Sequence, residues 1–70
     1  MSKQIKVYDF TKPELDYFIA NCNFSKDELE YFNLRAQYKS NVQIAMEMNV
    51  SESKVSKLAR KVKSKILRVL

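Results

Sequence analysis

The 70-residue sequence predicts an all-α fold of four helices that follow an extended N-terminal arm. Three segments place Ser or Thr three residues before Glu or Gln, ahead of apolar residues at helical spacing. They are Thr11 with Glu14, Ser25 with Glu28, and Ser40 with Gln43. In such a capping box each side chain accepts a hydrogen bond from a free backbone amide at a helix start. We therefore expect an arm over about residues 1–10 and a single domain over about 11–70, with helices near 12–22, 26–37, 41–48 and 52–68.

The N-terminal arm has a weak strand-like pattern. Ile5, Val7 and Phe10 alternate with polar residues. Because this chain offers a lone strand no partner, we expect an extended arm that lays Val7, Tyr8 or Phe10 over the helices. Pairing of the arm with a second copy of the chain is the alternative.

The first expected helix presents four apolar or sulfur-containing residues on one face: Leu15, Phe18, Ile19 and Cys22. Asn21 or Asn23 can supply the left-handed residue that usually ends a helix. A single cysteine has no partner for an internal disulfide, so we expect Cys22 to be a buried, reduced thiol and the protein to be cytoplasmic.

The remaining helices also show one apolar face each. The second carries Leu29, Phe32 and Ala36, widened by Tyr31, Leu34 and Tyr38. The third carries Val42, Ile44, Ala45 and Met48. The fourth carries Val55, Leu58, Ala59, Val62, Ile66 and Val69. We expect these faces to form the core.

The composition argues against an enzyme. The chain contains no glycine, which phosphate-cradling loops and dinucleotide fingerprints require for close backbone approach. It contains no histidine, which rules out histidine-based triads and most zinc sites. The carboxylates are scattered over helix starts rather than paired for acid–base chemistry. We therefore predict no catalytic residue, no cofactor and no metal.

Positive charge is concentrated in the second half. Residues 1–35 carry five basic and six acidic side chains, whereas residues 36–70 carry eight basic and two acidic ones. From Lys54 to the C-terminus there is no acid at all. Such a distribution is typical of a protein that binds a polyanion, although charge alone would also fit a solvated helix face.

The third and fourth expected helices are joined by only three residues, Asn49, Val50 and Ser51. A turn of this length is typical of the helix-turn-helix unit, whose second helix enters the major groove of DNA. Ala45 has the small side chain that a close crossing of two helices requires. Val50 has an apolar side chain that the turn would insert into the core. Asn49 tolerates the left-handed conformation in place of glycine.

Residues 24–66 resemble the DNA-binding module of LuxR-type regulators and of region four of bacterial sigma factors. The resemblance is carried by an aromatic–Ser–acid start at Phe24, Ser25 and Glu28, and by the run Val42-Gln43-Ile44-Ala45-Met46-Glu47-Met48. It closes on Val50, Ser51 and Val55. It implies that double-stranded promoter DNA is bound through the first two turns of the last helix, and that the protein is a small transcription regulator.

Carried over by position, the resemblance implies base-facing roles for Glu52, Ser53, Lys54 and Lys57. At these positions this sequence has Ser and Lys where the sigma pattern has Arg, Glu and Gln. The resemblance therefore implies no particular base sequence for the bound DNA. Cations and small polar residues around them are expected to contact phosphates. These residues are Lys39, Ser40, Asn41, Gln43, Ser56, Arg60, Lys61, Lys63 and Lys65.

Other interpretations remain open at this point. A protein-interaction module could bind RNA polymerase or another factor through Asp16, Asp27, Glu28 and Glu30. A basic amphipathic helix could lie on an anionic membrane, but its apolar face lacks aromatic residues. A phage-type packaging or replication factor could use the same unit. No apolar run is long enough to span a membrane. The apolar C-terminus, with Ile66, Leu67, Val69 and Leu70, also predicts a weak homodimer.

Overall fold

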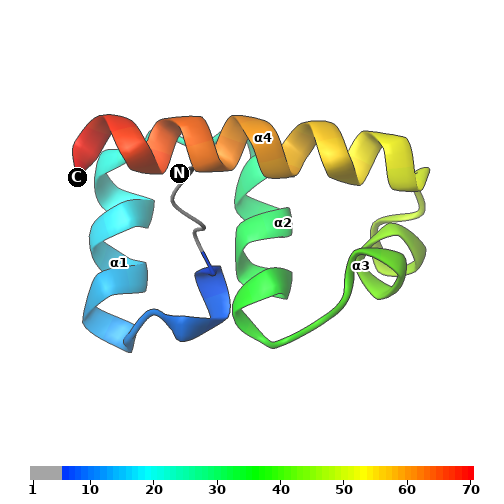
Figure 1. Cartoon of the computed structure of the whole chain (residues 1–70), viewed down its shortest axis with the longest axis horizontal. Helices are drawn as coiled ribbons and strands as arrows, with labels where there is room; N and C mark the ends of the chain where they lie inside the picture. Colours follow the sequence, from blue (N-terminus) through cyan, green and yellow to red (C-terminus); the bar gives the residue numbers. More distant parts are fainter. Residues whose placement is uncertain (1–5) are drawn as a thin grey trace, which may run out of the picture.

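The computed structural model describes residues 6–70 (Figure 1). A short 3-10 turn, η1 (Val7–Asp9), precedes α1 (Lys12–Asn21), α2 (Lys26–Ala36), α3 (Asn41–Met48) and α4 (Glu52–Val69). Residues 6–70 contain no strand, which confirms the predicted all-α fold. Each helix begins at the expected residue and ends within one residue of the expected position.

The long helix α4 lies across the other helices. Figure 1 shows α1 and α2 standing side by side, with α4 running over one end of both and α3 beside the beginning of α4. An 18-residue helix rises about 27 Å. It therefore runs nearly the whole 29 Å length of the molecule and contacts α1, α2 and α3.

All three predicted capping boxes are confirmed. Thr11, Ser25 and Ser40 each accept a hydrogen bond from the backbone amide three residues on, at 3.4, 3.3 and 3.2 Å. The reciprocal bonds run from the cap amides to Glu14, Glu28 and Gln43, at 2.8, 3.0 and 3.0 Å. The α4 helix begins without a box, because residue 54 is Lys, and Ser51 alone caps it.

Left-handed residues turn the chain where glycine is missing. Asn23 has φ 52° and Asn49 has φ 58°, so Asn23 rather than Asn21 supplies the turn after α1. Asn21 is instead helical and donates from Nδ2 to the Tyr17 carbonyl at 2.7 Å. Tyr38 was not expected to be left-handed, yet its φ is 67°.

The core is formed by side chains of all four helices and of η1. Its largest fully buried side chains are Phe32, Ile44, Val55, Val62 and Ile66. Cys22 is also buried, as predicted.

Three expected core positions are wrong: Ile19 on α1 is 37% exposed, and Tyr38 and Val42 are also exposed. Tyr38 is 73% exposed because the left-handed turn ends α2 before it, and Val42 is 51% exposed because α3 inserts mainly Ile44 and Ala45.

The N-terminal arm packs on the helices as expected, but it is not extended throughout. Val7–Asp9 form one 3-10 turn between extended residues Lys6 and Phe10, which corrects the prediction for that stretch. Val7 is buried, and the Phe10 ring lies 4.8 Å from that of Phe18. The predicted contribution of Ile5 lies outside the described residues.

The left-handed turn at Asn49 gives a test of the α3–α4 connection. Asn49→Gly should leave the free energy of unfolding nearly unchanged, because glycine adopts this conformation freely. Asn49→Val should lower it by about 1–2 kcal/mol, because Cβ branching disfavours positive φ. Urea unfolding followed by circular dichroism would measure both. Equal stability of the two variants would contradict the assigned turn.

Candidate nucleic-acid interface

The turn between α3 and α4 sets the two helices at a steep angle. Figure 1 shows α3 nearly end-on while α4 runs across the view. The Val50 amide donates to the Ala45 carbonyl at 2.9 Å, which closes the end of α3. Ala45 is buried and Val50 is half-buried against the core, as the sequence predicted for a helix crossing and a turn plug.

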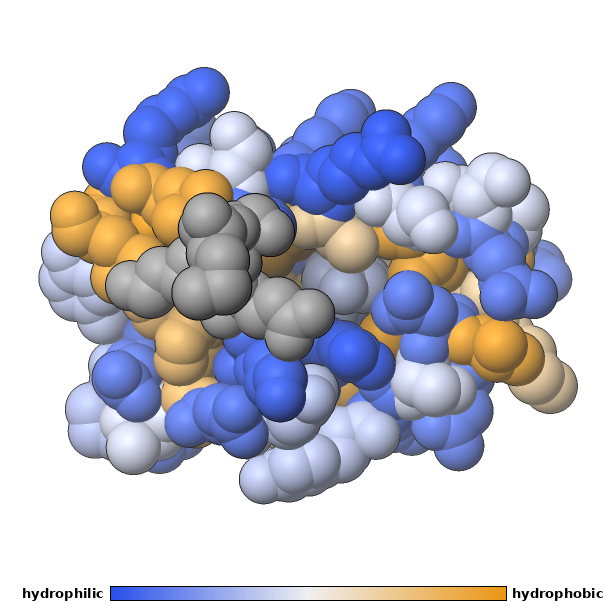
Figure 2. Space-filling view, in the orientation of Figure 1, coloured by the Kyte–Doolittle hydropathy of each residue, from blue (hydrophilic) through white to orange (hydrophobic). Residues whose placement is uncertain are grey.

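One face of α4 is left uncovered along its length. Val55, Leu58, Val62 and Ile66 point into the core. The opposite face carries most of the residues predicted to contact DNA. Its exposed members are Glu52, Ser53, Lys54, Ser56, Lys57, Arg60, Lys61 and Lys63. Figure 2 shows hydrophilic side chains projecting from the edge of the molecule where α4 lies.

Lys54 is exposed but has a partner. Its Nζ lies 3.5 Å from the carboxylate of Asp27 on α2, and both side chains are about half exposed. An ion pair at such a surface contributes roughly 0–1 kcal/mol. The lysine can therefore exchange this partner for another anion at little cost.

Lys65 points away from the uncovered face. Its ammonium forms an ion pair with Glu28 and donates to the Asn23 carbonyl at 3.1 Å, and its side chain is only 28% exposed. Glu28 is buried, and a buried carboxylate requires a compensating charge. Lys65 is therefore engaged in an internal ion pair, and the phosphate contact expected of it stays a prediction.

The pKa of Glu28 reflects these contacts. Burial alone would raise this pKa. It is nevertheless lowered below its ordinary value by the hydrogen bond and charge of Lys65, the hydrogen bond from the Ser25 amide and the charge of Lys61. Glu28 therefore accepts from the cap amide at the start of α2 and also connects α2 to α4 through its ion pair with Lys65.

The start of α3 is exposed but is occupied by its own bonds. Ser40 and Gln43 accept each other's backbone amides in the capping box. The ammonium of Lys39, which precedes α3, lies 2.6 Å from the carboxylate of Glu47 in α3. The lysine side chain is 30% exposed. Any phosphate contact here would have to use the outer faces of these groups, or the side chain of Asn41.

Three of the four acids expected to contact a protein partner form ion pairs within the chain, and their role in binding a partner stays a prediction. Asp16 pairs with Lys12 at 3.5 Å, Asp27 with Lys54, and Glu28 with Lys65. Glu30 is exposed and forms no ion pair within residues 6–70.

The apolar C-terminus is only partly covered. Ile66 is buried and Val69 is half-buried, whereas Leu67 and Leu70 are exposed. The homodimer stays a prediction.

Sequence reasoning missed two cations. Arg68 is exposed, and its spacing of seven residues from Lys61 and eleven from Lys57 puts it on the same face of α4, a signal the periodicity contained. Arg35 donates to the Lys39 carbonyl at 2.8 Å and lies 5.2 Å from the centre of the Tyr8 ring. Nothing in the local pattern of α2 indicated that role.

Comparison with known proteins adds no relative: no family model, curated protein or solved structure matches this chain.

Among the described helices, none has the length and apolar character that crossing a membrane requires. Residues 6–70 also hold no group of three or more His, Cys, Asp or Glu side chains placed to bind a metal.

The Glu28–Lys65 pair predicts a pH-dependent stability. A carboxyl whose pKa is lowered in the folded state stabilises the protein above its unfolded pKa of about 4.3, and this contribution is lost as pH falls through the lower folded value. Glu28→Gln should lower the free energy of unfolding by about 1–3 kcal/mol at pH 7 and flatten its acid dependence. Urea unfolding between pH 3 and 7 would measure this, with the exposed Glu30→Gln as control. Parallel pH curves for the wild type and Glu28→Gln would contradict the assignment.

Proposed function

We propose that the protein binds double-stranded DNA by placing the first turns of α4 in the major groove. The observation that carries this proposal is the uncovered face of α4, where Ser53, Lys57 and Arg60 follow one another next to the turn from α3. An α-helix with its side chains is 10–12 Å wide, and the major groove is about 12 Å wide. A helix with one free face can therefore enter it.

The residue types fit the expected division of contacts. Lys57 can donate to the guanine acceptors in the groove, and Ser53 can donate to or accept from any base edge. Arg60, Lys61 and Lys63 lie on the flanks of the same helix and are placed for phosphates. The resemblance to LuxR-type and sigma modules supports α4 as the helix that contacts the bases. It also supports a role in transcription regulation.

The packing of α4 disfavours the membrane alternative. A helix that lies on a bilayer must insert its apolar face among the lipids. In α4 that face, with Val55, Val62 and Ile66, is fully buried in the protein core. Membrane binding through α4 would require the domain to open, whereas DNA binding uses the face that is already free.

Selection of duplexes from a random pool at physiological salt would test the proposal. A common sequence among the bound duplexes is the expected result. Uniform recovery of all sequences would limit the activity to general DNA binding. Absence of any retained duplex, with a correctly folded protein, would overturn the proposal.

Substitution of Lys57 should separate base contacts from phosphate contacts. Lys57→Ala should weaken binding to the selected site by about 1–3 kcal/mol and weaken binding to a scrambled duplex less. Lys61→Ala should weaken both duplexes equally, because phosphates carry no sequence. Lys12→Ala on α1 serves as the charge-matched control. Fluorescence anisotropy would measure each Kd, and equal losses for Lys57→Ala on both duplexes would exclude base contact by that residue.

The salt dependence should report the number of phosphates contacted. The three cations assigned to phosphates, namely Arg60, Lys61 and Lys63, predict a slope of about −3 for log K against log salt concentration. Titration of duplex affinity between low and physiological salt would measure it. A slope near zero would mean that these lysines and the arginine do not meet the DNA backbone.

A further inference from the structure

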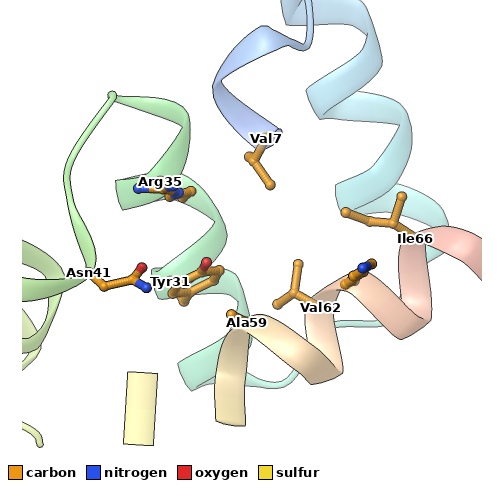
Figure 3. Close-up of a pocket in the computed structure, with 8 residues that line it drawn as sticks. Val7, Tyr31, Arg35, Asn41, Ala59, Val62 and Ile66 are labelled. Atoms are coloured by element: carbon orange, nitrogen blue, oxygen red, sulfur yellow. The ribbon is translucent and has the colours of Figure 1, made fainter. Parts of the chain in front are cut away.

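A small cavity lies on the flank of α4, at the border of the uncovered face, with which it shares Lys63. It has a volume of about 230 Å³ and opens between α2, α4, η1 and the start of α3. Figure 3 shows Arg35, Tyr31 and Asn41 on one side of this space, with Val62 and Ile66 on the other and Val7 reaching in from η1. Lys63 and Ala59 complete its lining.

Tyr31 supplies a buried polar group to the cavity. The residue is 5% exposed, and its hydroxyl forms no hydrogen bond with any group of residues 6–70. No buried side-chain oxygen in this range is both sealed from solvent and unpaired, so the hydroxyl meets solvent through the cavity. Burial raises the pKa of Tyr31, and the nearby charge of Arg35 lowers it less. The hydroxyl therefore stays protonated at neutral pH and can donate to a ligand.

Among the residues that the structure describes, two cations line the cavity and no carboxylate does. Arg35 is held in place by its bond to the Lys39 carbonyl and by the Tyr8 ring. Neither Arg35 nor Lys63 forms an ion pair within the described part of the chain, unlike Lys39, Lys54 and Lys65. The polar side of the cavity is therefore positively charged and not neutralised.

The other side of the cavity is apolar. Val7, Ala59, Val62 and Ile66 form it, next to the two cations. A volume of about 230 Å³ equals that of roughly eight water molecules in the liquid. A ligand of this site must therefore be small, with one anionic end and one compact apolar end.

We propose that this cavity binds a small amphipathic carboxylate. Its carboxylate would lie between Arg35 and Lys63 and accept from the Tyr31 hydroxyl, while a ring or short chain of about six carbons packs against Val62 and Ile66. Arg35 can offer two parallel N–H donors to the two carboxylate oxygens. The site shares Lys63 with the proposed DNA-binding face, and the proposal does not depend on DNA binding.

Titrations followed by amide NMR shifts at constant ionic strength would test the site, with benzoate, benzyl alcohol and acetate as probes. Benzoate should bind with a Kd of about 1 mM or tighter, with shifts around Tyr31, Asn41 and Lys63. Benzyl alcohol lacks the charge and acetate lacks the apolar body, so both should bind at least tenfold more weakly. Equal affinity for benzoate and either of the other probes would overturn the proposal.

Variants distinguish the cavity from general anion binding by the lysines. Lys63→Ala and Tyr31→Phe should each weaken benzoate binding at least about fivefold. The matched control is Lys61→Ala, which removes an exposed lysine from the same helix outside the cavity and should change nothing. Circular dichroism would verify that each variant is folded. An equal effect of Lys61→Ala and Lys63→Ala would show unspecific association and overturn the proposal.

Discussion

The apolar face of α4 is buried against the other three helices, and this burial holds the domain together. Val55, Val62 and Ile66 on this face are fully buried, and each such side chain contributes about 1.5–3 kcal/mol to folding. Because helix periodicity couples the two faces, burying these residues determines which side chains remain outside. The same packing turns Lys57 and Arg60 to solvent and removes the apolar surface that membrane binding through α4 would need.

Electrostatic contacts divide the lysines of the second half into two groups. Lys39, Lys54 and Lys65 meet acids of the same chain: Lys54 and Lys65 connect α4 to α2, and Lys39 connects the α2–α3 loop to α3. Lys57 and Lys61, on the uncovered face of α4, form no ion pair within residues 6–70. A net positive charge therefore does not by itself describe the binding surface. The proposed binding surface consists of the cations that do not form ion pairs within the fold.

Local signals explain why much of this fold could be predicted. A capping box acts within four residues, so Ser25 and Ser40 indicated helix starts without knowledge of the rest of the chain. Tyr38 and Lys65 could not be placed in this way. The exposure of Tyr38 follows from a left-handed turn in a residue that rarely adopts it, and the direction of Lys65 follows from a buried acid 37 positions earlier. The cavity beside Arg35 likewise exists only once η1 packs against α2.

Mapping amide NMR shifts while a selected duplex is added would show whether the free face of α4 contacts duplex DNA. We expect the largest changes between Glu52 and Lys63, with smaller ones at the start of α3 and none on α1. Changes centred on α1, or spectra unaltered by saturating duplex, would rule out the proposed contact.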